Sequence, residues 1–137
     1  MVARIRGQGK PRWYRTGLGL MAPIPESIVL HQQSRALELV YADAKRYKLS
    51  FEFLRVHSPS AEVQGHGAGQ QVLQTGKREV RIDAIEPVGN YALKLVFSDG
   101  HDSGLYAWDL LHRFSQHQET MWEDYLLALQ AAGASRD

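Results

Sequence analysis

The chain of 137 residues contains no cysteine. Disulfide bonds, thiolate metal sites, iron–sulfur ligation and a cysteine nucleophile are therefore excluded. The sequence also lacks long apolar runs, because no stretch approaches the roughly 20 apolar residues that a membrane-spanning helix needs. With 44% hydrophobic and 23% charged residues, its composition is that of an ordinary globular domain. These features predict a cytoplasmic protein that does not cross a membrane.

Acidic residues are absent from the first 20 positions, which carry five basic side chains. The other positions carry 11 basic and 15 acidic side chains, so their net charge is −4. This acidic balance argues against nucleic acid as a partner outside the basic extension. Because the extension is rich in glycine and has no helical or strand period, we expect disorder over residues 1–24. Three roles are open for this extension. It is a nucleic-acid or membrane arm, a targeting peptide, or a stretch upstream of a natural start at Met21.

Short apolar segments, three of them with alternating polarity, predict the strands of this protein. They lie at residues 27–33, 35–42, 80–88, 91–97 and 103–107. The first two are joined by two polar residues, which indicates a hairpin. The third is expected to end at its proline, and the fourth to turn alternate apolar side chains toward one face. Because no βαβ spacing is present, the sheet is expected to be antiparallel.

Helix and loop signals separate these strands. Residues 43–48 are charged and predict a turn. Ser50 has the features of an N-cap, and Pro59 disfavours helical geometry at the residue before it, so a short helix should end by about His57. Residues 64–76 hold four glycines and few large apolar groups, which is typical of a loop.

The end of the chain is rich in helix-forming residues. A helical turn is predicted at 109–114 and a longer helix at 119–132, with Gly133 as the residue that ends it. An apolar stripe on this helix should pack on the domain, and a helix that binds a partner is the alternative; the stripe consists of Met121, Trp122, Tyr125, Leu126 and Leu129. The predicted fold is therefore α+β (mostly β), a small antiparallel sheet with short helices over 25–116, followed by a C-terminal helix and tail over 117–137.

Motifs for known chemistry are incomplete in this sequence. The glycines of 64–76 match neither the phosphate-binding loop nor the dinucleotide-binding fingerprint, and no serine lies in a Gly-x-Ser-x-Gly elbow. Three histidines, His57, His66 and His101, lie in loops or at the ends of elements, where a neutral imidazole could bind zinc, nickel or copper. The histidines at 31, 112 and 117 are expected at the surface. An enzyme would need a deep pocket with two coupled titratable groups, and spacing identifies no such pair.

Two longer stretches identify a family. FLRVHSPSAEVQGH (53–66) and FSDGHDSGLYAWDLL (97–111), separated by a pair of strands, together resemble the DUF971 family, also called the gamma-butyrobetaine hydroxylase-like N-terminal domain. The resemblance covers about residues 26–115. Members of this family are small bacterial proteins. Similar domains are found at the N-terminus of carnitine-biosynthesis dioxygenases and at the C-terminus of plastid P-loop iron–sulfur carrier proteins.

The resemblance implies a structural zinc site in the dioxygenase version of this domain. Its three cysteines fall on Ser58, Ser60 and Val63 of this chain, and its histidine falls on His101. Serine hydroxyls are poor zinc ligands and valine is none. We therefore expect no cofactor, although zinc or another divalent metal stays open with His101 as a ligand. We predict that hydrogen bonds from the two serines and His101 replace the metal.

The iron triad of the related dioxygenases belongs to a separate catalytic domain, so no oxidoreductase activity is carried over to this chain. The first hypothesis is a non-catalytic interaction or accessory module with an unknown protein partner, linked to iron–sulfur carrier machinery by family analogy only. Its expected binding surface consists of Arg55, His57, Glu62, His66, Asp99, His101 and Trp108. The alternatives are a metal-binding accessory protein that uses His57, His66 and His101, and an enzyme for a small polar substrate.

Overall fold

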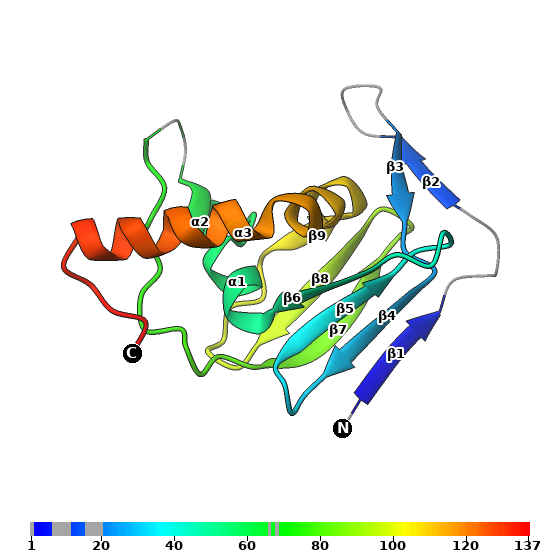
Figure 1. Cartoon of the computed structure of the whole chain (residues 1–137), viewed down its shortest axis with the longest axis horizontal. Coiled ribbons are helices and arrows are strands. Elements are labelled where there is room, and N and C mark those ends of the chain that lie inside the picture. Colours follow the sequence, from blue (N-terminus) through cyan, green and yellow to red (C-terminus); the bar gives the residue numbers. More distant parts are fainter. Residues whose placement is uncertain (1, 7–11, 16–20, 66, 68) are drawn as a thin grey trace.

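The computed structural model describes residues 2–6, 12–15, 21–65, 67 and 69–137 (Figure 1). In this part of the chain the strands form three antiparallel sheets, with the orders β1-β4-β5-β6, β2-β3 and β7-β8-β9. The strands are β1 (Val2–Arg6), β2 (Arg12–Arg15), β3 (Met21–Ile24), β4 (Ser27–His31), β5 (Ala36–Val40), β6 (Arg46–Ser50), β7 (Ile82–Val88), β8 (Ala92–Phe97) and β9 (Leu105–Ala107). The helices are α1 (Phe51–Val56), α2 (Ala61–Gln64) and α3 (Trp108–Ala131).

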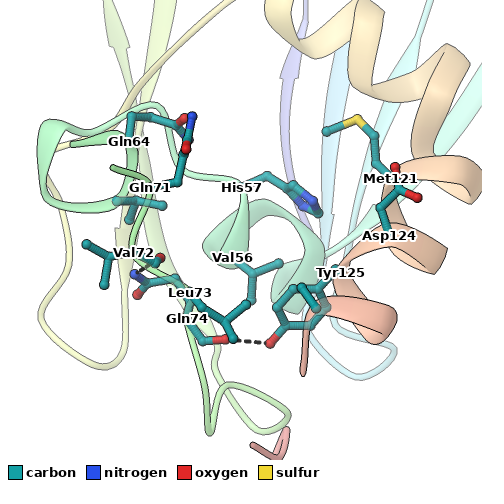
Figure 2. A pocket seen from close by; sticks show the side chains of 12 residues that line it. Val56, His57, Gln64, Gln71, Val72, Leu73, Gln74, Met121, Asp124 and Tyr125 are labelled. Carbon is teal, nitrogen blue, oxygen red and sulfur yellow. Dashed lines mark hydrogen bonds between the residues drawn. The ribbon is translucent and has the colours of Figure 1, made fainter. Parts of the chain in front are cut away.

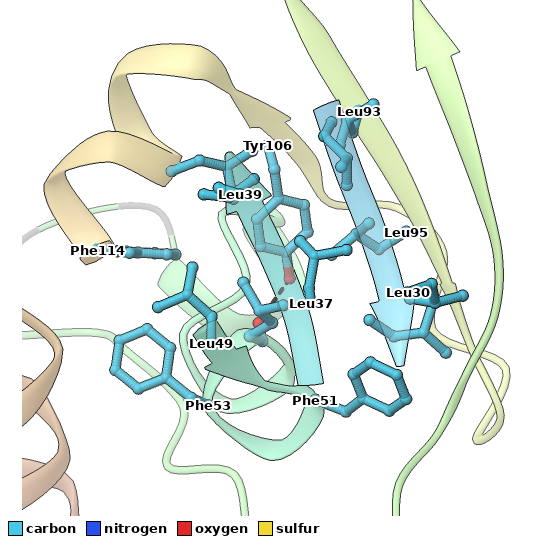
Figure 3. Close-up of a cluster of buried hydrophobic side chains, with 14 of the residues drawn as sticks. Leu30, Leu37, Leu39, Leu49, Phe51, Phe53, Leu93, Leu95, Tyr106 and Phe114 are labelled. Carbon is cyan, nitrogen blue, oxygen red and sulfur yellow. Dashed lines mark hydrogen bonds between the residues drawn. The ribbon is translucent and has the colours of Figure 1, made fainter. Parts of the chain in front are cut away.

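The predicted α+β class, the antiparallel pairing and the C-terminal helix are confirmed. Helix α3 is longer than the sequence indicated. The described strands are divided among three separate sheets, where the sequence suggested one. Side chains from the four-stranded and three-stranded sheets meet in one core (Figure 3).

The hairpin of β4 and β5 shows how the sequence pattern produces this core. Leu30 lies opposite Leu37, and Ile28 lies opposite Leu39. Because side chains alternate between the two faces of a strand, these four residues share one face. All four are buried against α1 and the three-stranded sheet β7-β8-β9.

The charged turn predicted at 43–48 is shorter in the structure. It is closed by a hydrogen bond from the backbone N–H of Tyr41 to the carbonyl of Lys45, and β6 begins directly after it, at Arg46. In β6 the buried Leu49 follows two residues after the half-buried Tyr47, while charged residues occupy the other face. The high charge of this edge strand conceals its period of two.

The basic extension contains strands where disorder was expected. β1 pairs with β4 along Val2–Arg6, and β2 pairs with β3 along Arg12–Arg15. Residues 7–11 and 16–20 of the extension lie outside the described part of the chain. The physical reason for β1 is the edge of β4, whose backbone groups offer hydrogen bonds to a neighbouring strand.

The three-stranded sheet β7-β8-β9 follows the prediction closely. Leu93, Leu95 and Phe97 of β8 are buried on one face as expected, whereas Tyr91 lies just before the strand and is exposed. Pro87 does not end β7, which continues to Val88. A proline is tolerated there because β7 is an edge strand, where a missing N–H disturbs no ladder.

Helix α3 is one continuous element rather than a turn followed by a separate helix. Its sequence holds no glycine or proline that would break it. Of the predicted stripe, Tyr125 and Leu129 are buried, Met121 and Trp122 are half-buried, and Leu126 is exposed. Gly133 has φ +63°, as expected for a residue that ends a helix.

Figure 1 shows α3, in orange, lying over the layer of strands, with α1 and α2 next to it. Val56 of α1 packs with Tyr125 and Leu129 of α3 in a second, smaller apolar cluster. Within the residues that the structure describes, no helix combines the length and apolar character needed to cross a membrane.

Candidate functional site

The stretch after α1 is shaped by local capping, as the sequence predicted. The Ser50 hydroxyl accepts a hydrogen bond from the backbone N–H of Phe53, at 3.0 Å, and so caps the helix. The helix ends with His57 as its C-cap, two residues before Pro59. Ser60 then caps the single turn of α2 by accepting from the N–H of Glu62, at 3.2 Å. Ser58 lies between the two helices.

A buried histidine joins this stretch to the second family motif. The Nε2 atom of His101 lies 2.8 Å from the hydroxyl of Ser58, and its Nδ1 atom lies 3.2 Å from a carboxylate oxygen of Glu62. Because a carboxylate only accepts, the consistent neutral tautomer has Nδ1 donating to Glu62 and Nε2 accepting from Ser58. Burial, followed by the nearby Arg55 charge, lowers the pKa of His101, which favours this neutral form.

The hydroxyls of Ser58 and Ser60 have further partners. Ser58 accepts from the backbone N–H of Ser60 at 3.2 Å, and the Ser60 hydroxyl lies 2.7 Å from that of Ser103. Gly104 covers the cluster, because a Cβ atom at this position would lie 2.5 Å from the Ser58 hydroxyl. The predicted hydrogen bonds from the two serines and His101 are therefore confirmed.

An ion cluster borders the histidine on the other side. Asp99 accepts from Arg55 Nε at 2.9 Å, from Lys77 Nζ at 2.6 Å and from the His101 backbone N–H at 3.2 Å. Burial alone would raise the pKa of Asp99, but the bonds from Lys77, His101 and Arg55 outweigh it and lower the pKa to about 2. A second nitrogen of Arg55 donates to Gln74, at 2.9 Å.

His57 lies in different surroundings from His101. Its Nδ1 atom lies 2.9 Å from the carbonyl of Phe53, and its ring packs against Phe53, Phe114 and Tyr125. Since a carbonyl accepts, Nδ1 is the donor and Nε2 is left as an acceptor. Burial lowers the pKa of His57, so the ring is neutral near pH 7.

The predicted binding surface is thus brought together only in part. Arg55, Glu62, Asp99 and His101 form one network, whereas Trp108 donates to the carbonyl of Asn90, at 2.7 Å, and takes no part in it. Arg55, His101 and Trp108 are only 6–7% exposed, so they support the interior rather than offering contact area. His66 lies outside the described residues. The other histidines have different surroundings. His31 forms a hydrogen bond with Glu38, at 2.9 Å, and His112 packs edge-on against buried Tyr41.

The donor set does not fit zinc. Both nitrogens of His101 already have protein partners, and the three family cysteine positions hold two hydroxyls and the buried side chain of Val63. Among the described residues no group of three His, Cys, Asp or Glu side chains is arranged to hold a metal ion. Of the predicted metal set His57, His66 and His101, the described members His57 and His101 have different hydrogen-bond partners, and His66 lies outside the described residues.

An open groove that the sequence did not predict lies beside α3 (Figure 2). Its volume is about 630 Å³. One wall is formed by the end of α1, by α2 and by residues 71–74, and α3 forms the other. Its apolar lining includes Val56, Val63, Val72, Leu73, Met121 and Tyr125, and its polar lining consists of His57, three glutamines and Asp124.

Two hydrogen bonds hold the loop wall of this groove in place. The Tyr125 hydroxyl donates to the carbonyl of Gln74, at 2.7 Å, and the backbone N–H of Val72 donates to the carbonyl of Val63, also at 2.7 Å. The side chain of Val72 nevertheless stays 53% exposed. The only feature of the sequence that pointed to this groove was the apolar stripe on α3, for which binding of a partner was the alternative to packing on the domain. The position of the loop wall could not be predicted, because its anchor Tyr125 is 51 residues from Gln74 in sequence.

Comparison with known proteins places these features in a family context. A family model described as "Gamma-butyrobetaine hydroxylase-like, N-terminal" matches residues 28–112. No curated protein matches the chain.

Several solved structures resemble the chain, including two NMR structures and one crystal structure. One protein, solved in solution by NMR, is 53% identical over 85% of this chain and 91% of its own, with a TM-score of 0.75. A second NMR structure is 48% identical over 93% of this chain and 86% of its own, with a TM-score of 0.69. A crystal structure of a protein of unknown function from Acidithiobacillus ferrooxidans, assigned to the DUF971 family, is 38% identical over 66% and 91%, with a TM-score of 0.56.

Proposed function

Because the chain belongs to the gamma-butyrobetaine hydroxylase-like N-terminal (DUF971) family, we propose that it is a non-catalytic interaction module. It binds a partner protein in the groove between α3 and residues 71–74. The proposed binding site therefore differs from most of the binding surface that the sequence predicted. Of that predicted surface, His57 lines the groove and Glu62 lies next to it.

The observation that carries the proposal is the apolar lining of an open groove on the protein surface. Val72 and Met121 both line the groove; Val72 is 53% exposed and Met121 is half-buried. Exposed apolar groups that are rimmed by polar ones are typical of protein-binding sites. The groove also lies between elements held by the Tyr125–Gln74 hydrogen bond, so its shape exists before a partner arrives.

The chemistry of the polar clusters supports a role without catalysis. The imidazole of His101 bonds Ser58 and Glu62, and its backbone N–H bonds Asp99, which stabilises the connection between α1 and β9. In the groove, His57 donates to a backbone carbonyl, and the shift of its pKa is explained by burial and that bond without any carboxylate. Acid–base catalysis uses coupled titratable groups that can reach a substrate.

The class of partner follows from the family resemblance alone. Similar domains are fused to P-loop iron–sulfur carrier proteins, so these carriers are the first candidates. Two domains that are fused in one protein often correspond to separate chains that associate in another organism, and the choice of partner rests on this analogy. The groove itself is the part of the proposal that can be tested without knowing the partner.

Site-specific photo-crosslinking in the source cells tests the groove. A diazirine-bearing amino acid would replace Val72 in the groove, or Leu127, which is 62% exposed on α3 and does not line the groove. We expect a discrete crosslinked species from position 72 and none of that mass from position 127. The crosslink should disappear with Ala128→Arg, which places a long side chain in the groove.

A matched variant controls for effects on the helix. Gln130→Arg adds the same side chain to an exposed position about 200° away around α3, and it should leave the crosslink intact. Absence of any crosslink from position 72 would refute the proposal. A crosslink that survives Ala128→Arg would do the same, because the partner would then not occupy the groove.

A further inference from the structure

The groove has an electrostatic bias that points to the chemistry of its occupant. We infer, on the basis of the proposed function, that the groove binds a segment of a partner protein in which an apolar side chain lies next to a lysine or arginine. The apolar group would contact Met121, Val56 and Leu73, and the basic group would approach Asp124. Three observations support this assignment.

The first observation is the charge of the lining. Among the described residues that line the groove, Asp124 is the only side chain with a formal charge, and none is a lysine or arginine. Figure 2 shows Asp124 beside Met121 on α3, with the ring of His57 pointing toward these two residues from the opposite wall. A carboxylate at the margin of an apolar surface favours a cation at that margin.

The second observation is the charge of the segments that border the groove. Residues 56–76, which include α2 and the loop wall, contain Glu62 as their only charged side chain. Its side chain is 71% exposed. Residues 114–135 of α3 and its end contain three acidic side chains and no basic one. The nearby cations are engaged elsewhere, since Arg55 and Lys77 bond Asp99, and Arg136 bonds Glu52.

The third observation is the direction of the polar groups in the lining. The Nδ1–H of His57 donates to the carbonyl of Phe53, and the side-chain amide of Gln64 donates to the carbonyl of Ser58, at 2.8 Å. The Nε2 atom of His57 and the amide oxygen of Gln64 are therefore acceptors. Together with the carboxylate of Asp124, these acceptors suit a ligand that brings hydrogen-bond donors, as lysine and arginine do.

Two synthetic peptides of 14 residues test the inference. Both have leucine at helical spacing, and the other positions are lysine in one peptide and glutamate in the other. Binding would be measured by titration calorimetry at 150 mM salt, and the site by chemical-shift perturbation in ¹H–¹⁵N spectra. We expect the Leu/Lys peptide to bind with shifts concentrated at residues 71–74 and 121–128, and the Leu/Glu peptide to bind at least about tenfold more weakly.

Charge reversal at neighbouring positions of α3 provides the matched pair of variants. Asp124→Lys should weaken the Leu/Lys peptide by about tenfold, because an attraction is lost and a repulsion is added. Glu123→Lys makes the same change at an exposed residue outside the lining, and it should change binding by less than about threefold. Both positions are exposed, so neither change disturbs the core.

The outcomes separate this inference from the proposed function. Equal binding of the two peptides in the groove would overturn the preference for a basic partner and leave an interaction groove in place. Equal effects of the two charge reversals would also overturn it, because general attraction would then explain the binding. If the Leu/Lys peptide binds outside the groove or not at all, the inference is wrong, and the crosslinking at Val72 decides the proposed function separately.

Discussion

The hydroxyl of Ser58 is predicted to be essential for the stability of the cluster around His101. We expect Ser58→Ala to lower the free energy of unfolding by about 2–3 kcal/mol. The side chain is completely buried, and its hydroxyl bonds both the imidazole of His101 and the backbone N–H of Ser60. Alanine would leave the Nε2 atom of His101 and this N–H without their partner.

The magnitude follows from the groups left behind. A buried polar group that loses its partner costs about 1–3 kcal/mol, more than the net stabilisation of about 1 kcal/mol that an average hydrogen bond provides. Two groups are affected here, but the hydrogen bond to Ser60 is long, at 3.2 Å, and contributes less. Removing one oxygen atom creates little empty space, so the cavity adds little. At the size of this chain, a loss of 2 kcal/mol lowers the melting temperature by roughly 5–10 °C.

Urea unfolding followed by tryptophan fluorescence would measure the change at pH 7.5, with equal slopes required for the comparison. Ser34→Ala is the matched control, because Ser34 is exposed in the turn between β4 and β5. It should stay within about 0.5 kcal/mol of the wild type. The double variant Ser58→Ala/His101→Leu should be less destabilised than the sum of the single variants, by about 1 kcal/mol or more.

The explanation would be refuted if Ser58→Ala were as stable as Ser34→Ala. It would also be refuted by additive effects in the double variant, because additivity means that the two side chains do not act as a unit. In either case, the polar stretch between α1 and α2 would not be what replaces a metal in this protein.

Other perturbations test the remaining polar groups. Arg136→Ala should lower the free energy of unfolding in urea by about 2–3 kcal/mol, because the buried carboxylate of Glu52 loses its two hydrogen bonds, at 2.8 and 2.6 Å. A fully buried ion pair would cost more, but the Arg136 side chain is 29% exposed. Glu52→Gln/Arg136→Ala should recover part of this loss, and no recovery would contradict the explanation. Stability should fall as the pH decreases below 6.5. Burial lowers the pKa values of His57 and His101 from 6.5, so the unfolded chain binds more protons than the folded one in this range. The stability that the neutral histidines contribute is therefore present above pH 6.5 and is lost below it. Urea midpoints at pH 7.5 and 5.0 would measure this, and His101→Gln should reduce the difference. EDTA should leave the melting temperature of untagged protein, grown with added zinc, unchanged within about 1 °C, since a bound structural metal would contribute several kcal/mol. Stoichiometric zinc by elemental analysis, lost in His101→Ala, would contradict it.

Features that depend on neighbouring residues could be predicted from the sequence. Ser50, followed by helix-forming residues and then by Pro59, predicts where α1 begins and ends. Gly133 marks the end of α3 because a positive φ suits glycine. The alternation of β5 and β8 predicts their buried faces. Each of these signals acts over a few residues, so the chain alone contains it.

Charge and composition misled the prediction where a neighbour decides the outcome. The arginines and glycines of the extension suggested disorder, but the edge of β4 provides a partner for Val2–Arg6. Lys48 and Arg46 suggested a turn, but pairing with β5 makes this segment a strand. Leu126 was expected to pack, yet α3 turns it toward solvent.

The absence of cysteine, the two family motifs, the N-cap of α1 and the strands β4, β5, β7, β8 and β9 could be predicted from the sequence alone. Only the tertiary structure decided that Ser58 meets His101, 43 residues away, and that both nitrogens of this histidine are engaged. Only the tertiary structure placed residues 71–74 against α3 and so created the groove. The physical reason is that spacing along a chain reports contacts within a few residues, whereas a network or a groove depends on how separate elements pack together.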